Sequence, residues 1–264
     1  MSTIETNRSW THFRVHRRNP RYCHVTFDHP PINTITATTV AELSDLAGLI
    51  EQDPDLNVVV FDSANRDFYL AHYDLENDPG RTEALGVGPT GQSAWIDVLV
   101  RPSGSCSPVV CGSPLARTRF SASGKLASVV PGGGPMARLS RLVGRGRALE
   151  ILLVADDLDG PRAEQYGYVN RLIADDQLDA EVEAIASRLA RFDHDAIART
   201  KSYVDQVTLP DNSELGPPWN DFLELFRRPA QQAQSARLRE LGLNTDGEFE
   251  RSLGRRLVES FPDA

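Results

Sequence analysis

The stretch VVVFDSANRDFYLAHYDL, residues 58–75, joins an apolar run to a polar segment that contains a histidine. Its beginning, VVVFDS (58–63), predicts a buried β-strand, because a short unbroken apolar run is typical of a strand covered on both faces. Residues 66–75 form a polar, turn-prone junction after this strand. A single histidine such as His72 is more often a packing or surface residue than a catalytic one, and Asp74 is equally suited to capping a helix.

Upstream of this strand, YCHVTF (22–27) alternates in the manner of a second strand. A helix is predicted to begin between them at Thr39, since Thr39 and Glu42 have capping-box spacing. Its apolar residues recur at close to the helical period: Val40, Leu43, Leu46, Ala47 and Ile50. A strand, a helix and a strand within about forty residues indicate a βαβ unit, and therefore an α/β fold with a parallel sheet.

Three consecutive glycines, Gly132, Gly133 and Gly134, precede an arginine-rich helical stretch. Glycine permits a close approach of the backbone to a ligand, and a helix N-terminus favours anions. The pattern G-x-G-x-x-A, completed by Ala137 with Asp156 about 20 residues on, is one that an NAD-binding oxidoreductase would use. A purely structural glycine turn and the wall of a ligand pocket are the other interpretations. A Walker A loop is excluded, because no Gly-Lys-Ser/Thr follows.

The second half of the sequence is predicted to be mainly helical. A short helix around PRAEQYG and a strand over residues 168–173 precede an amphipathic helix over residues 176–192. The segment LPDNSELGPP (209–218) is predicted to interrupt the later helices as a linker. Residues 101–128 fit no element, because serine, glycine and proline supply 13 of their 28 positions and the periodicity disappears.

Composition excludes several classes of protein. The net charge of −9 disfavours general nucleic-acid binding. No apolar run reaches the ~20 residues of a membrane span, and the N-terminus lacks a signal-peptide pattern. Three cysteines without a CxxC pair predict reduced thiols, a cytoplasmic protein and no metal site.

Three stretches together are similar to the enoyl-CoA hydratase/isomerase (crotonase) family. Residues 58–75 resemble its first active-site segment, a strand followed by F-x-A-G-A-D-[IL]. PGGGPMARLSRLVGRGRALEILLVADDLDGPRAEQYGYVNRLI (131–173) resembles its P-G-x-G-G-x-x-R-L-x-R-x-x-G stretch and the A-x-x-x-G-x-V-N that follows. DHPPINTI (28–35) resembles its P-x-x-N turn. The resemblance covers residues 20–75 and 129–205.

The resemblance implies a crotonase-like ββα spiral with a C-terminal helical region. The expected division is a core over residues 1–192, in which 101–128 is atypical, and a helical region over 193–264 that mediates oligomerisation. A homotrimer or hexamer is therefore expected.

The resemblance also implies a site in which two backbone N–H groups hold the thioester oxygen of an acyl-CoA as it becomes an enolate. AHYD lies over the family's AGAD, so the Tyr73 N–H is the expected first donor, and His72 stands where the family has glycine. Tyr73 and His72 are the predicted catalytic residues. The predicted substrate-binding residues are Ala71, Asp74, Gly112, Gly132, Gly133 and Gly134. Coenzyme A enters as part of the substrate, and no separate cofactor is expected.

The chain departs from the family between the matched stretches. The family's second donor segment, G-x-A-x-G-x-G-x-E, is not found, and Gly112 is its nearest relic. No acidic residue lies between Asp97 and Glu150, the interval from which hydratases of this family take two catalytic glutamates. Three hypotheses follow: an enzyme of fatty acid metabolism with impaired activity that uses His72 or Tyr73 for proton transfer, an inactive acyl-CoA-binding or assembly protein, or an altered segment at 101–128.

Overall fold

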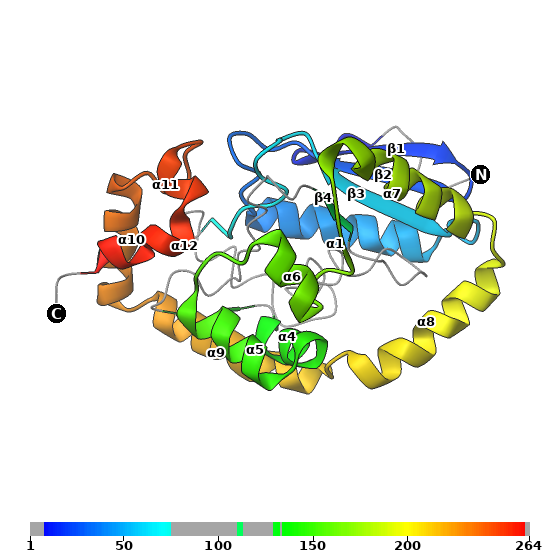
Figure 1. The fold of residues 1–264 in the computed structure, drawn as a ribbon. Helices are drawn as coiled ribbons and strands as arrows, with labels where there is room; N and C mark the ends of the chain where they lie inside the picture. Colours follow the sequence, from blue (N-terminus) through cyan, green and yellow to red (C-terminus); the bar gives the residue numbers. More distant parts are fainter. Residues whose placement is uncertain (1–7, 75–109, 113–128, 133, 262–264) are drawn as a thin grey trace.

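The computed structural model describes residues 8–74, 110–112, 129–132 and 134–261 (Figure 1). Its first unit is a three-stranded sheet in the order β1-β2-β3. β1 (Phe13–Asn19) pairs antiparallel with β2 (Tyr22–Phe27), and β2 pairs in parallel with β3 (Val58–Ser63). The predicted strands 22–27 and 58–63 and their parallel pairing are confirmed, whereas β1 was not predicted.

Helix α1 (Ala37–Glu51) makes the crossover from β2 to β3. It begins two residues before the predicted start, with Thr36 as its N-cap. The prediction of a Thr39–Glu42 capping box is wrong, because the capping box is formed by Thr36 at the N-cap and Thr39 at N3. Each threonine hydroxyl accepts a hydrogen bond from the backbone N–H of the other threonine. Glu42 instead accepts hydrogen bonds from the backbone of residues 11 and 12, before β1.

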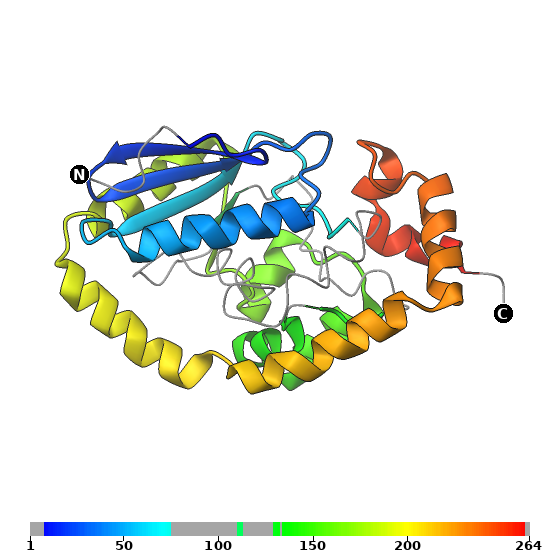
Figure 2. The same ribbon diagram turned by 180° about the vertical axis from the view of Figure 1, so that it is seen from behind.

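Helices cover both faces of this sheet (Figures 1 and 2). On one face α1 buries Val40, Leu43 and Leu46, all at 0% exposure, and so confirms the predicted apolar stripe. On the other face α7 (Asp175–Leu189) buries Ala186 against Tyr22. Fully burying one leucine side chain stabilises the fold by about 1.5–3 kcal/mol, so the two helices fix the sheet between them.

A second unit contains a two-stranded parallel sheet of β4 (Val110–Gly112) and β5 (Arg171–Ile173). β5 lies within the predicted strand 168–173 and is shorter. The glycine-containing bend leads into α4 (Pro135–Val143), α5 (Arg145–Leu149), the π-helical turn η1 (Glu150–Val154) and α6 (Gly160–Tyr166). These helices share a small apolar core centred on Leu139, Ile151 and Ala163.

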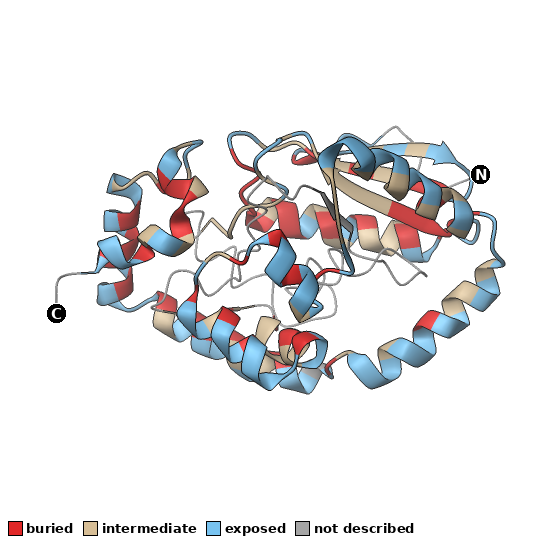
Figure 3. Ribbon diagram, viewed as in Figure 1, coloured by how far each residue is buried: buried red, intermediate tan, exposed pale blue. Residues whose placement is uncertain are grey.

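The C-terminal region is helical, as predicted. Its elements are α8 (His194–Thr208), α9 (Asn212–Phe226), α10 (Pro229–Glu240), α11 (Glu248–Arg251), α12 (Leu253–Arg256) and the 3-10 turn η2 (Leu257–Ser260). α8 and α9 run along one side of the molecule, and α10–α12 gather at its end (Figure 1). α8 is mostly exposed (Figure 3), whereas α10–α12 form a core that also takes in Ala155. No helix in the described ranges has the length and apolarity that crossing a membrane requires.

The linker predicted over residues 209–218 is wrong, because α9 runs through most of it with Pro217 and Pro218 inside the helix. A capping box between Asp211 and Glu214 starts this helix. Four apolar side chains at helical spacing hold it down: Leu215, Trp219, Phe222 and Phe226, each at most 7% exposed. Their burial outweighs the cost of the two prolines, about 3 kcal/mol each in a helix interior.

Candidate functional site

The segment after β3 forms a short extended strand beside the turn that precedes α1. Ile35 and Tyr73 make a parallel β-bridge. The Ile35 N–H donates to the His72 carbonyl at 3.1 Å, and the Asp74 N–H donates to the Ile35 carbonyl at 2.7 Å. In such a bridge the N–H and C=O of the middle residue point to the opposite side of the strand. The Tyr73 N–H is therefore directed away from Ile35.

Asn33 fixes the backbone that leads to Tyr73. It is 1% exposed and left-handed, with φ at 56°, a conformation that asparagine tolerates better than most residues. Its side-chain NH₂ donates to Ser63 Oγ at 2.8 Å and to the carbonyls of Phe68 and Tyr69 at 3.3 and 3.0 Å. The Asn33 carbonyl accepts from the Ala71 N–H at 3.1 Å. The P-x-x-N turn thus positions the strand through one buried amide.

A local network shapes the bend between β3 and this strand. Ser63 Oγ donates toward the carbonyls of Asn65 and Phe68 at 2.9 and 2.7 Å. Asn65 Oδ1 accepts from the backbone N–H groups of Asp67 and Phe68 at 2.8 and 3.0 Å. These side chains satisfy backbone groups of the turn, which is why the polar stretch SANRDF follows an apolar strand.

The His72 ring has a partner at each nitrogen. Nε2 lies 2.8 Å from Glu250 Oε1, and Nδ1 lies 3.2 Å from the Tyr73 carbonyl oxygen. Burial alone lowers the His72 pKa, but the Glu250 carboxylate, the Tyr73 carbonyl and the Asp74 charge outweigh it, so the pKa lies above its ordinary value. Two acceptors around one ring suit a protonated imidazolium that donates at both nitrogens. This arrangement supports the packing interpretation of His72, and its catalytic role stays a prediction.

Residues of the C-terminal region meet the same strand, and sequence reasoning missed them. Asn244 Nδ2 donates to Asp74 Oδ1 at 3.3 Å, and Glu250 Oε1 accepts from the Asn244 N–H at 2.6 Å. The residues that a helix capped by Asp74 would contain begin at position 75 and lie outside the described residues. Because His72 and Glu250 are 178 positions apart, no local pattern in the sequence pairs them.

The glycine bend packs against α9. A Cβ on Gly132 would lie 3.2 Å from ring carbons of Trp219 and Phe222. Gly134 has φ at +82°, and a Cβ added there would clash with a Leu215 methyl carbon. These contacts favour the structural interpretation of both glycines. Gly133 lies outside the described residues.

The dinucleotide interpretation finds no support in this bend. Residues 129–132 are not in a strand, whereas the fingerprint follows one directly. Asp156, the predicted ribose contact, is exposed.

Gly112 ends β4, where it pairs with Ile173 of β5. α7 contacts both β3 and β4, so it lies between the two sheets. The rest of the atypical segment 101–128, including Cys106, lies outside the described residues. The role of Gly112 in binding substrate stays a prediction.

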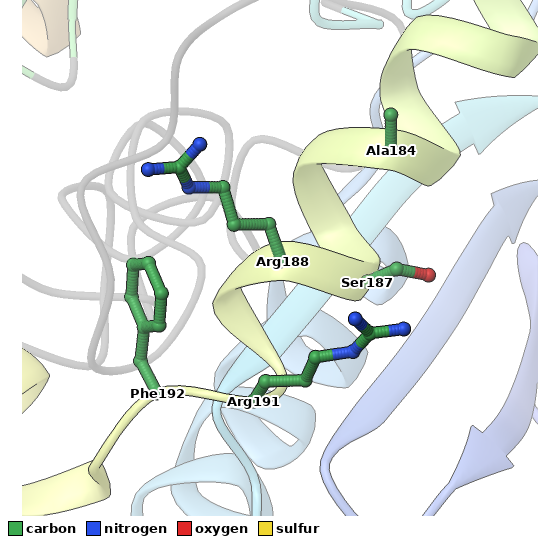
Figure 4. Close-up of a pocket in the computed structure, with 5 residues that line it drawn as sticks. All are labelled: Ala184, Ser187, Arg188, Arg191 and Phe192. Carbon is green, nitrogen blue, oxygen red and sulfur yellow. The ribbon is translucent and has the colours of Figure 1, made fainter.

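A shallow pocket of about 490 Å³ lies at the C-terminal end of α7 (Figure 4). It is lined by Ala184, Ser187, Arg188, Arg191 and Phe192. The Arg188 guanidinium lies 5.7 Å from the Phe192 ring centroid. Arginines at this end of a helix offset the negative end of its dipole, and none of residues 71–74 lines the pocket. We therefore do not assign the candidate site to it.

Comparison with known proteins finds one family that this chain resembles. The model of the family described as enoyl-CoA hydratase/isomerase matches residues 106–215. A crystal structure of a candidate enoyl-CoA hydratase from Streptomyces avermitilis superposes with a TM-score of 0.82 and 28% identity, over 98% of this chain and 100% of that one. The chain is therefore similar to the enoyl-CoA hydratase/isomerase family in sequence over residues 106–215 and in its overall fold. The predicted crotonase-like α/β fold with its helical C-terminal region is thereby confirmed.

Two curated relatives match a smaller share of the chain. The chain is 25% identical over 175 residues to the crotonyl-CoA hydratase of Syntrophomonas wolfei, across 60% of this chain and 67% of that protein. It is also 25% identical over 183 residues to the short-chain-enoyl-CoA hydratase of Clostridium acetobutylicum, across 62% of this chain and 70% of that protein. The family model begins at residue 106, so its match extends into the atypical segment that the motif resemblance left out.

Proposed function

We propose that this crotonase-like protein binds an acyl-CoA thioester and stabilises its enolate oxyanion with the Tyr73 N–H. The bridge to Ile35 carries this proposal, because it uses the carbonyl of His72 and the N–H of Asp74 and directs the Tyr73 N–H to the other face. An N–H group fixed before the reaction, where negative charge develops, lowers the barrier without reorganisation.

The hydrogen bond from Ile35 also strengthens the proposed donor. The His72 carbonyl and the Tyr73 N–H belong to one peptide group, and the carbonyl accepts from Ile35 at 3.1 Å. Such a bond polarises the peptide, so its N–H donates more strongly, by roughly 10–30% per bond. The geometry therefore suits a donor for a developing anion.

A second function, acyl-CoA binding without turnover, is favoured by one observation on the sequence. The interval between Asp97 and Glu150 has no carboxylate, while it holds eight arginines and lysines. General acid–base catalysis contributes about 10²–10⁴-fold, so an enzyme without these groups is slow unless other residues transfer the proton. The same positive interval attracts an anionic CoA ester.

The two functions separate in one assay. Crotonyl-CoA is incubated with the protein, loss of the enoyl absorbance is followed, and binding of crotonyl-CoA and of CoA is measured by calorimetry. Turnover supports the first function, and binding without turnover supports the second. Absence of both contradicts the proposal.

Two variants at one position test the main-chain role. Tyr73→Pro removes the N–H and should lower turnover by about 10²–10³-fold, the typical effect of losing one oxyanion donor. Tyr73→Phe keeps the N–H and removes only the hydroxyl, so turnover should stay within about threefold. A loss of turnover in Tyr73→Phe with an unchanged melting temperature would move the role to the phenol and overturn the assignment.

A further inference from the structure

We propose that Glu250 is a positioning residue, which reaches from α11 to His72 and holds the strand that carries the Tyr73 N–H. This inference rests on the proposed function of that N–H. It gives the C-terminal region a role within the site of its own chain, in addition to the oligomerisation predicted for it.

Three side-chain contacts join the C-terminal region to the segment around Tyr73. The Glu250 carboxylate contacts His72 Nε2 at 2.8 Å, immediately before Tyr73. The Asn244 amide contacts Asp74 Oδ1 at 3.3 Å, immediately after Tyr73. Further along, Arg251 Nε lies 3.1 Å from Asp67 Oδ2. His72 and Asp74, the two neighbours of Tyr73, therefore both contact residues of the C-terminal region.

Burial makes the contact with Glu250 the strongest of the three. The Glu250 side chain is 2% exposed and that of His72 is 12% exposed, whereas Arg251 and Asp67 are 36% and 55% exposed. A charge pair shielded from water is little screened, while an exposed pair contributes almost nothing. Loss of the Glu250 carboxylate removes the acceptor at His72 Nε2, and such a loss at a buried polar group destabilises the protein.

Glu250 also shapes the turn from which Asn244 reaches the strand. Its Oε1 accepts the Asn244 N–H at 2.6 Å, and Asn244 has a left-handed backbone with φ at 66°. One carboxylate oxygen therefore organises both contacts that flank Tyr73. Nearby residues of the C-terminal region are buried and apolar: Leu243, Phe249 and Leu253 belong to the core of α10–α12. Burying a carboxylate among apolar side chains costs free energy, so packing does not explain Glu250. Its contacts with His72 and Asn244, which hold the strand, do explain it.

The experiment compares Glu250→Ala, Glu250→Gln and Glu259→Ala in the full chain. Glu250→Gln keeps an acceptor for both His72 and Asn244, and Glu259→Ala breaks only the exposed Arg256–Glu259 pair in the same region. Turnover of crotonyl-CoA should fall in Glu250→Ala by about 10²-fold, mainly in kcat, because a displacement of ~1 Å has that effect. Glu250→Gln should recover most of the loss, and Glu259→Ala should match the wild type.

Amide hydrogen exchange gives a readout that does not depend on activity. Glu250→Ala should speed exchange in residues 68–74 by about tenfold or more while α1 stays protected, and Glu250→Gln should not. A wild type without turnover contradicts catalysis by the Tyr73 N–H, yet exchange still tests the positioning. Unchanged exchange at 68–74 in Glu250→Ala, or an equal rise in α1, overturns the inference, as does equal loss of kcat in the alanine and glutamine variants.

Discussion

The strand at residues 71–74 and the bend at Gly132–Gly134 both carry motif residues of the family, and they are held in opposite ways. Directional hydrogen bonds hold the strand from Asn33, Ile35 and Glu250. The bend is held by apolar contact with α9. Hydrogen bonds fix the direction of a backbone N–H, whereas packing only fills space. The direction of the strand is therefore fixed by hydrogen bonds, whereas the bend allows the close approach of α9.

The largest expected effect is at the strand. Asn33→Ala removes every side-chain hydrogen bond of a residue that is 1% exposed and places alanine at φ 56°, so the free energy of unfolding should fall by about 3–5 kcal/mol. Urea denaturation measures it. The matched control is Asn19→Ala, an exposed asparagine that accepts one backbone hydrogen bond and should cost about 0.5 kcal/mol. An equal loss of unfolding free energy in the two variants would contradict the role of Asn33 in holding the strand.

The next effect concerns the bend. Gly134→Val forces a β-branched residue to φ +82° and a Cβ against Leu215, so stability should fall by about 2–4 kcal/mol. Gly146→Ala is the control, because a Cβ there meets nothing within 4 Å and alanine favours its helix. Ligand binding by folded Gly134→Val should be unchanged. A weaker affinity for crotonyl-CoA at unchanged stability would make the bend a pocket wall instead.

The smallest effect is the dependence of stability on pH. The His72 pKa is raised in the folded protein, so its pair with Glu250 contributes fully below the ordinary histidine value of about 6.5. That contribution is lost as pH rises through the folded pKa. The stability advantage of the wild type over His72→Gln should therefore shrink from about pH 6 upward. His16→Gln, on the exposed face of β1, is the control. An advantage that grows with pH would contradict the assigned pair.

Much of the fold follows from local patterns in the sequence. The apolar run at β3, the stripe of α1 and the alternation in β2 gave correct elements because each buries one side of a regular structure. β1 was missed since its sequence, FRVHRRN, exposes arginine and histidine and is stabilised by pairing with β2. The first part of α9, residues 212–218, was predicted as part of a linker because its prolines are local signals, while the contacts that hold it come from the glycine bend.

The candidate site was only partly predictable for the same physical reason. The motif located Tyr73 and the turn with Asn33, because both lie in short segments with characteristic residues. The partners of His72 and Asp74 come from residues 244–250, and long-range partners leave no trace in local spacing. The presence of His72 where the family has glycine was the one feature of the sequence that pointed to an additional side-chain contact of this strand, which the structure gives to Glu250.

The separation of 178 residues between His72 and Glu250 also has a consequence for biosynthesis. At roughly 5–20 residues per second, a ribosome needs roughly ten to forty seconds after it adds the histidine to add its acidic partner. During that interval the nascent sheet and α1 can already fold. The Nε2 atom of His72 does not yet have the Glu250 carboxylate as its acceptor. The contact between His72 and Glu250 therefore forms only after the residues of the sheet and of α1 have been synthesised.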